Sequence, residues 1–504
     1  MHITKHLQII VVVAMVLILA ALPWAVNASP SAAGDIDLAA IDDYIQAQMD
    51  KHNLKGVALA ITQGDEILYL EGYGTAGQGR PMTPQTPMYI GSQSKSFTAL
   101  AIAQLAEQGL VDVQSPVRTY IPWFAVADEA ASARITVSHL LHHTSGLSDA
   151  GFLTILPENA SIEDAVRALA SARLTAPIGQ RHQYFNLGYD VLAYIVETVS
   201  QQPYAEYVQA HIFDPLQMAH TYTDPALVAQ NGLSQGYSRF FGFPIAVRQP
   251  SPRYELAAGY LISSAEDMAH YAITMSNDGV YEGTRVLSSE WMRQLFRPVY
   301  GYGMGWFVEP GHIYHGGANE TFKTFVDLYP QRNLGIVLLI NQGYMLDHFI
   351  SAEQLFAGVE ALVLGEPVPA VSAGWSVKVI GWALLALVLG LIVFQARNIY
   401  HLRDWRERAA RWSPARRAWD VAISFLIPTA ILIVVFSQVK AFWGDRFNLT
   451  FQLLMMARTL PDITILMIVG SVPDYAQGVT KLYWVLRSRA RPTLQGDAAW
   501  ENVS

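Results

Sequence analysis

Apolar runs stand at the two ends of this 504-residue chain and leave a long mixed segment between them. Three of these runs lie near the C-terminus: 379–394, 421–439 and 463–485. Each reaches or approaches the ~20 residues that a helix needs to cross a bilayer, although Gly470, Pro473 and Asp474 interrupt the third. Together they predict a membrane-attached protein with a three-helix transmembrane region at 377–491 (~377–396, ~419–439, ~463–485).

The N-terminal apolar run indicates export. Residues 7–25 are nearly all apolar behind Lys5, and Val26-Asn27-Ala28 offers a small-residue cleavage pattern. Residues 1–28 are therefore expected to be a signal peptide. An uncleaved N-terminal anchor is the alternative, because the run approaches spanning length.

Basic residues suggest how the C-terminal runs are oriented. Two clusters contain them: Arg397, Arg403, Arg406, Arg408, Arg411, Arg416 and Arg417 between the first two runs, and Arg487, Arg489 and Arg491 after the third. Both clusters are expected in the cytoplasm, together with the tail 492–504. This orientation places residues 34–365 outside a bacterial plasma (inner) membrane. Helices buried in a soluble core are the alternative interpretation of the runs.

Overall composition excludes several classes of protein. The net charge of −9 disfavours nucleic-acid binding, and the basic clusters suit anionic lipid head groups better. The absence of cysteine rules out disulfides, thiolate metal sites and a cysteine nucleophile. The expected partners are a lipid bilayer and a small-molecule or peptide substrate.

The segment 34–365 has strand patterns at both ends and helical patterns between them. Strands are predicted at 57–62, 67–71, 303–309, 313–315, 322–329 and 334–340. Helices are predicted at 36–52, at the closing segment 348–364 and throughout the middle. We therefore expect an α/β (α+β) fold: one antiparallel sheet flanked by helices, an inserted helical region, and a cleft between them. Residues 366–376 are expected to be the linker to the first span.

Ser92 and Lys95 form the first element with chemical meaning. A Ser-x-x-Lys at the start of a helix puts a hydroxyl and an amine one turn apart on one face, so the lysine can accept the serine proton. Apolar residues recur at helical spacing from Phe97 onwards. A second copy, Ser437 to Lys440, lies at the edge of an apolar run and is taken as accidental.

Two further elements follow Ser92 in the chain, Tyr184-Phe185-Asn186 and His315-Gly316-Gly317. The three elements in this order resemble the serine β-lactamase and penicillin-binding-protein superfamily, in particular its class C β-lactamase-like branch. That branch includes D-aminopeptidases, DD-peptidases and esterases. Supporting segments are similar too: Leu140 to Leu147, Ala257 to Tyr260, Ala265 to Met268, and Tyr302 to Trp306.

The resemblance implies a role for each residue. Ser92 would be acylated, Lys95 would deprotonate it or tune its neighbour, and Tyr184 would act as general base and acid. A cationic lysine nearby would favour the tyrosine phenolate. Asn186 would hydrogen-bond the substrate amide, and the N–H groups of Ser92 and Ala318, next to Gly317, would form the oxyanion hole.

The third element departs from the most common family form. Many members carry Lys where this chain has His315, and histidine at this place is found among peptidases and esterases. The chain is also similar to membrane-bound peptidases that remove N-acyl-D-asparagine from natural-product precursors, such as the colibactin-maturing peptidase. That similarity makes Asn319 the candidate specificity residue. Asn186 departs from this subgroup, in which serine is expected.

Two other local patterns match motifs of other chemistry. Gly232-Leu233-Ser234-Gln235-Gly236 fits the nucleophile elbow of α/β-hydrolases, but the elbow needs a strand before the serine and a helix after it. The pair His142-His143 invites a metal hypothesis, yet adjacent helical residues do not face each other. A structural loop is favoured for that pair, and the sequence requires no metal or organic cofactor.

The sequence therefore predicts an extracytoplasmic, membrane-anchored serine hydrolase that forms an acyl-enzyme on Ser92. A peptidase or amidase that acts on D-amino-acid-containing or N-acyl peptides, with prodrug maturation as one form, is the main hypothesis. An esterase of the same family is the enzymatic alternative. A penicillin-binding sensor or β-lactamase is the third possibility.

Overall fold

The computed structural model describes residues 36–149, 152, 156–228, 232–369, 376–443, 453 and 456–489. These residues form two compact units. The first comprises Leu22–Val379 together with Trp443–Leu460, and the second contains the helices of Ile380–Phe442 and the segment from Pro461 onwards. The expected signal peptide and C-terminal tail lie outside the described residues.

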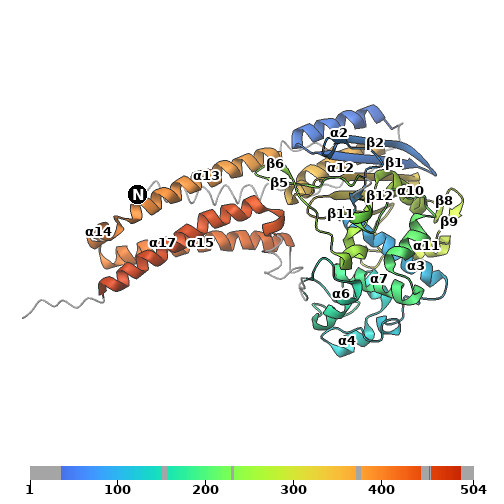
Figure 1. The fold of residues 1–504 in the computed structure, drawn as a ribbon, viewed down its shortest axis with the longest axis horizontal. Helices are drawn as coiled ribbons and strands as arrows, with labels where there is room; N and C mark the ends of the chain where they lie inside the picture. The colour runs from blue at the N-terminus through green and yellow to red at the C-terminus, as the bar shows by residue number, and fades with distance from the viewer. Residues whose placement is uncertain are drawn as a thin grey trace, which may run out of the picture. The chain divides into compact units, whose positions relative to one another are not determined.

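A seven-stranded antiparallel sheet organises the first unit, with strand order β10-β11-β12-β13-β1-β2-β3 (Figure 1). Its strands are β1 (Gly56–Gln63), β2 (Glu66–Gly77), β3 (Arg80–Pro81), β10 (Phe307–Glu309), β11 (His312–Ala318), β12 (Lys323–Tyr329) and β13 (Leu334–Ile340). The first and last parts of the domain meet where β1 pairs with β13. The expected antiparallel sheet, assembled from the two ends of the domain, is confirmed.

Both faces of the sheet are covered, which explains why β13 is apolar throughout. Side chains alternate between faces along a strand, so Val337 and Leu339 join one core and Ile336 and Leu338 join another. The second core is closed by α2 (Leu38–His52) and α12 (Ala352–Leu364). The first core is larger and joins the sheet to the helical region.

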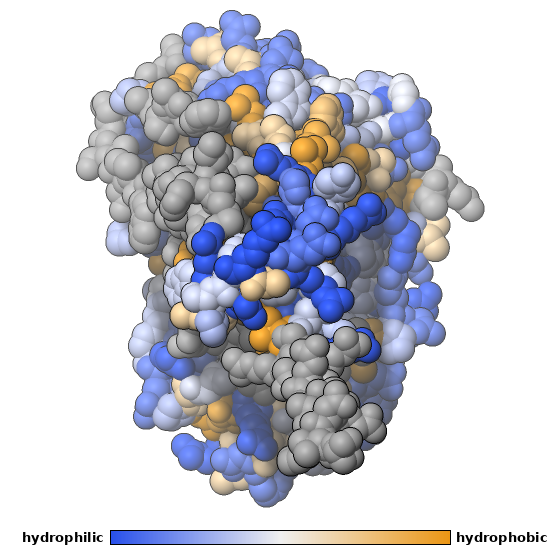
Figure 2. Space-filling view, turned by 90° about the vertical axis from the view of Figure 1, so that its left-hand side faces the viewer, coloured by the Kyte–Doolittle hydropathy of each residue, from blue (hydrophilic) through white to orange (hydrophobic). Residues whose placement is uncertain are grey.

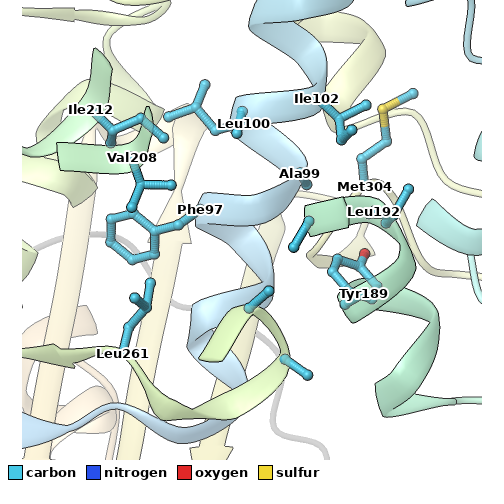
Figure 3. Close-up of a cluster of buried hydrophobic side chains, with 14 of the residues drawn as sticks. Phe97, Ala99, Leu100, Ile102, Tyr189, Leu192, Val208, Ile212, Leu261 and Met304 are labelled. Atoms are coloured by element: carbon cyan, nitrogen blue, oxygen red, sulfur yellow. The ribbon is translucent and has the colours of Figure 1, made fainter. Parts of the chain in front are cut away.

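The helical region is built around α3 (Ser94–Glu107), from which Phe97, Leu100 and Ile102 radiate into the core (Figure 3). A helix that is apolar on nearly all sides is buried on nearly all sides. It packs against α7 (Asn186–Ser200), α8 (Tyr204–Val208) and α11 (Ser289–Leu295), while α5 (Val137–Leu141) and α6 (Ile162–Ala168) pack on α7, and α10 (Ala265–Ser276) packs on β1 and β13. Two further helices of the unit are α4 (Glu129–Arg134) and α9 (Pro225–Val228). Three short two-stranded sheets also belong to the unit: β4 (Met88–Tyr89) with β7 (Ile262–Ser263), β5 (Tyr237–Phe240) with β6 (Phe243–Ala246), and β8 (Val280–Tyr281) with β9 (Thr284–Arg285).

The described residues of the second unit are helical apart from short turns at 403–404 and 411–413. It contains α13 (Val377–Leu402), α14 (Trp405–Ala410), α15 (Pro414–Trp443) and α17 (Pro461–Arg489). Within the described chain, α13 and the segment Pro414–Ser437 are long and apolar enough to cross a membrane, whereas α17 is not. The expectation of three apolar helices is therefore wrong for the third.

Polar residues on one face of α17 explain this correction. Asp474 accepts a hydrogen bond from the Gln395 amide at 3.1 Å, and Gln477 donates to the oxygen of the same Gln395 at 3.1 Å. Lys481 lies 2.9 Å from Asp420. These polar side chains lower the hydropathy of α17. The hydrogen bonds and the ion pair between helices satisfy them.

Basic residues gather where α13 and α15 are joined. Figure 2 looks at the side that carries α14 in Figure 1, and hydrophilic side chains cover much of it. The arginines of this turn are Arg403, Arg406, Arg408, Arg411, Arg416 and Arg417. Several of them contact aromatic rings, as Arg416 does with Trp412. An apolar helix pair with a basic turn is the pattern expected of a cytoplasmic loop.

Candidate active site

Ser92 lies in a tight turn, Gly91–Gln93, directly before α3. Ser94 holds this turn, because its hydroxyl donates to the Gly91 carbonyl at 2.7 Å and accepts the Leu261 N–H at 3.1 Å. Gly91 has φ +56°, a conformation that residues with a side chain rarely adopt. Ser92 is itself half-buried, so its hydroxyl is accessible while its backbone is fixed.

Lys95 is fully buried one turn beyond Ser92. Its Nζ lies 3.2 Å from Ser92 Oγ and 2.5 Å from the Ala258 carbonyl oxygen. It also stands 4.8 Å from the ring centroid of Tyr184. The structure thus brings the first and second sequence elements together around one amine. The Ala258 carbonyl, supplied by the segment Leu256–Tyr260, was not identified from the sequence as a lysine partner.

Tyr184 and Asn186 are positioned by the start of α7. Phe185 between them is buried in the core and separates the two side chains, while Asn186 is the first residue of the helix. Asn186 Oδ1 is buried and has no hydrogen-bond partner within the described part of the chain. A buried acceptor left in this state costs ~1–3 kcal/mol, so the site is prepared for an N–H donor.

His143 belongs to this site, although the sequence suggested only a structural loop. Its ring centroid lies 4.3 Å from that of Tyr184, and its Nδ1 accepts the Phe185 N–H at 3.2 Å. The residue has φ +55°, which is unusual outside glycine. The strained backbone and the hydrogen bond place a ring directly against the tyrosine. The segment Leu140 to Leu147 was the only available sequence signal.

Strand β11 carries the third element to the nucleophile. A Cβ added at Gly317 would lie 1.9 Å from the Ile90 carbonyl oxygen, and one added at Gly91 would lie 2.5 Å from the Ala318 nitrogen. Only glycine therefore fits at either position. This close approach puts the Ala318 backbone N–H beside the turn that holds Ser92.

His315 is buried on β11 with both ring nitrogens near groups of the protein. Its Nε2 lies 3.1 Å from the Tyr302 hydroxyl, and its Nδ1 lies 2.7 Å from the Gly316 carbonyl oxygen. Burial lowers its pKa to about 3, and the charge of Lys95 acts in the same direction. The ring is therefore neutral at physiological pH, with Nδ1 carrying the proton that the carbonyl accepts.

Asn319 follows Ala318 at the end of β11 and is held at three atoms. Its backbone N–H donates to the Phe322 carbonyl at 3.1 Å, and its Oδ1 accepts the Phe322 N–H at 3.1 Å. Its carbonyl oxygen lies 3.2 Å from His348 Nε2. The amide nitrogen Nδ2 is buried without a partner among the described residues. Asn319 thus offers one fixed donor.

Two acidic residues stand behind Lys95. Burial raises the pKa of Asp190 well above its usual value, and Glu255 raises it further. Burial also raises the pKa of Glu255 to about 7, with a contribution from Asp149, whereas the Lys95 charge lowers it. The Lys95 charge lowers the pKa of both carboxyl groups and so opposes the effect of burial. The sequence did not indicate these residues because they lie outside the three elements.

The competing patterns take other places in the fold. Ser234 follows the helix α9 rather than a strand and precedes β5 rather than a helix, so it does not form a nucleophile elbow. Its Oγ lies 3.0 Å from the Asn341 amide nitrogen. His142 Nδ1 lies 2.9 Å from the Ser138 carbonyl oxygen. Ser437 lies within the long helix α15, so the decoy element has no turn before it.

Comparison with known proteins agrees with this geometry. The Beta-lactamase family model matches residues 41–358, which is most of the first unit. This chain therefore belongs to the β-lactamase family, whose members include penicillin-binding proteins and are serine hydrolases. Its match to protein flp of Staphylococcus aureus is 28% identical over 313 residues, covering 60% of this chain and 62% of the relative. A match to the putative penicillin-binding protein PbpX of Bacillus subtilis is 28% identical and covers 57% of this chain and 70% of the relative.

Solved structures share the fold. The octameric penicillin-binding protein homologue of Pyrococcus abyssi superposes with a TM-score of 0.58 at 24% identity, covering 70% of this chain and 81% of that one. FmtA of Staphylococcus aureus gives 0.55 at 21% identity, covering 69% and 94%. EstCE1, a hydrolase with promiscuous acyltransferase activity, gives 0.55 at 20% identity, covering 64% and 97%. At these identities the likeness concerns the fold alone.

Proposed function

We propose that this protein is a peptidase or amidase that forms an acyl-enzyme on Ser92 and acts on N-acyl or D-amino-acid-containing peptides. The observation that carries the proposal is the buried, unpartnered Oδ1 of Asn186. A scissile amide bears an N–H that satisfies this acceptor, whereas an ester has none. Sites built around a buried polar group discriminate strongly against substrates that lack its partner.

The reaction follows from the contacts around Lys95. Transfer of the Ser92 proton to Lys95 or Tyr184 lets Oγ form a bond to the substrate carbonyl carbon. The N–H groups of Ser92 and Ala318 stabilise the resulting oxyanion. Tyr184 then gives a proton to the departing amine as the C–N bond breaks. Water then gives a proton to Tyr184 and forms a bond to the acyl carbonyl carbon, and the Oγ–C bond breaks as Ser92 regains a proton from Lys95 or Tyr184.

His315 acts in this scheme as a positioning residue. A buried neutral ring with both nitrogens beside protein groups does not present a permanent cation to a substrate carboxylate. This supports a peptidase over a β-lactamase that holds the drug carboxylate with a lysine at this position. Asn319 Nδ2 is the donor proposed to bind a substrate carbonyl, and a D-asparagine side chain is one candidate.

Matched substrates test the proposal. An N-acyl-D-aminoacyl anilide should be turned over, and the p-nitrophenyl ester of the same acyl group should gain little rate advantage from its better leaving group. Asn186→Leu should reduce kcat/KM for the anilide by about tenfold or more and leave the ester nearly unchanged. Ester turnover without any anilide turnover would favour the esterase alternative. An acylation burst without steady turnover of either substrate would favour a penicillin-binding sensor.

We further propose that α13 and α15 anchor the protein in the plasma membrane with the catalytic unit outside. Two helices of sufficient length and hydropathy support this location, and so does the basic turn between them. The chain spans 62% of the length of the curated relative protein flp, so the role of the whole protein is included in this proposal.

A further inference from the structure

A short segment far from the catalytic elements in sequence belongs to the same compact unit. Residues 456–460 form a helical turn, with the Leu460 N–H donating to the Met456 carbonyl at 2.9 Å. Met456 and Leu460 are both buried, which fixes the turn. The match to the family ends at residue 358, so this segment is an addition to the common catalytic domain.

Arg458 in this turn reaches the loop that follows Asn319. Its Nη2 lies 2.9 Å from Glu320 Oε1. The other carboxylate oxygen, Oε2, accepts the Gln249 amide at 2.7 Å, and Gln249 Oε1 in turn accepts the Thr321 N–H at 3.1 Å. Glu320 is therefore held by Gln249 through one oxygen and pairs with Arg458 through the other.

The ion pair lies among the charged groups of the active site. Glu320 helps to raise the pKa of Glu255, the same carboxyl group on which Lys95 acts. Arg458 opposes the rise in the pKa of Tyr260, which lies two residues after the Lys95 partner Ala258. Glu320 itself comes two residues after Ala318. Arg458 is thus close to the end of β11 that carries Ala318.

The Arg458 guanidinium has further donors and is exposed enough to bind a ligand. A guanidinium carries five N–H donors, and the contact with Glu320 engages one nitrogen. The side chain is 42% exposed, so substrate can reach it. Because Glu320 already neutralises its charge, a neutral carbonyl oxygen is a better ligand than a second carboxylate, which would meet repulsion from Glu320 and Glu255.

We propose that Arg458 is a specificity residue that hydrogen-bonds a peptide carbonyl of the substrate beyond the residue bound at Asn319. The inference rests on the proposed function and gives the C-terminal region a part in catalysis besides anchoring. Arg458 should lower KM for substrates long enough to offer that carbonyl, and it should not affect KM for small acyl groups.

The test uses the full-length protein, two probes and a matched control. The probes are an N-acyl-D-dipeptidyl anilide and p-nitrophenyl acetate. The variants are Arg458→Gln and the control Arg487→Gln, whose guanidinium lies 2.9 Å from the Tyr483 hydroxyl in α17. Arg458→Gln should raise KM for the anilide about tenfold, the size of one hydrogen bond to a charged group, with kcat within about twofold. Turnover of p-nitrophenyl acetate should stay at the wild-type value.

The outcomes separate this inference from the proposed function. Equal KM values for wild type and Arg458→Gln, with normal fluorophosphonate labelling of both, would overturn the role of Arg458 only. Slower labelling of Arg458→Gln would also overturn it, because the arginine would then act on Ser92 rather than on substrate. An unlabelled wild type would instead refute the acyl-enzyme itself. Glu320→Gln should reproduce part of the KM effect, and the double variant should be less than additive.

Discussion

The Tyr302 hydroxyl lies 3.1 Å from Nε2 of His315, and both residues are buried. Because His315 is neutral and its Nδ1 faces the Gly316 carbonyl, Nε2 is an acceptor and Tyr302 is its donor. The hydrogen bond therefore fixes the histidine tautomer and holds β11, which carries Ala318 and Asn319, to the segment around Tyr302.

Removing this donor should destabilise the catalytic unit. Tyr302→Phe leaves a buried acceptor without a partner, at an expected cost of about 1–3 kcal/mol. Tyr300→Phe is the control, since Tyr300 is exposed and donates to the Gly179 carbonyl at 3.1 Å. The unfolding temperature should fall clearly for Tyr302→Phe and change little for Tyr300→Phe. Equal unfolding temperatures would contradict the assigned hydrogen bond.

A buried ion pair joins Arg239 of β5 to Asp347. Arg239 is fully buried, and its Nε lies 2.6 Å from Asp347 Oδ2. Asp347→Asn should destabilise the unit by about 3–5 kcal/mol, because the guanidinium would remain buried without its counter-charge. Glu129→Gln, which breaks the exposed pair with Arg118, should change the unfolding temperature little. Comparable decreases in stability for the two variants would show that the buried pair contributes no more than the exposed one.

His52 should contribute to the pH dependence of stability. Burial lowers its pKa to about 4, and the charge of Lys51 acts in the same direction. Between about pH 6.5 and 4 the unfolded state binds a proton here that the folded state does not, so stability falls as pH falls through this window. The slope is about 1.4 kcal/mol per pH unit when the difference is one full proton.

The variant His52→Gln removes that contribution. The difference in unfolding temperature between wild type and His52→Gln should move against wild type as pH falls from 6.5 to 4. His211→Gln, at an exposed histidine, is the control. A difference that stays constant over this range would be inconsistent with a buried neutral His52.

The absence of cysteine makes the membrane orientation easy to measure. Ser171 and Ser413 are both exposed, the first in the catalytic unit and the second in the basic turn before α15. A membrane-impermeant maleimide should label Ser171→Cys in intact cells and label Ser413→Cys only after lysis. Labelling of Ser413→Cys in intact cells would reverse the proposed orientation.

The sequence predicted those parts of the structure that depend on local pattern. Apolar runs and helical spacing identified the long strands of the sheet and the helix after Ser92, because both patterns follow from burial in a core. Lys95 was found with Ser92 because the two are neighbours on one turn. Asp190 and Glu255 were not identified, and Tyr302 was identified only as part of a supporting segment. Their positions near Lys95 and His315 depend on tertiary packing that no short spacing encodes.

The helix α17 is a second case in which contacts between distant residues decide the structure. A hydropathy window averages all faces of a helix. Asp474 and Lys481 of α17 therefore interrupt an apolar run in the sequence, although in the structure they bind Gln395 and Asp420. Arg458 could not be assigned from sequence for a related reason. It precedes α17 and meets Glu320 only because the chain returns to the catalytic unit.

Labelling of the nucleophile tests the central claim most directly. Wild-type protein and Ser92→Ala are treated with a fluorophosphonate probe, and the labelled peptide is located by mass spectrometry, with Ser234→Ala as the control serine. We predict one adduct on Ser92 in wild type and in Ser234→Ala, and none in Ser92→Ala. A wild-type adduct on another residue, or labelling that survives in Ser92→Ala, would contradict the account.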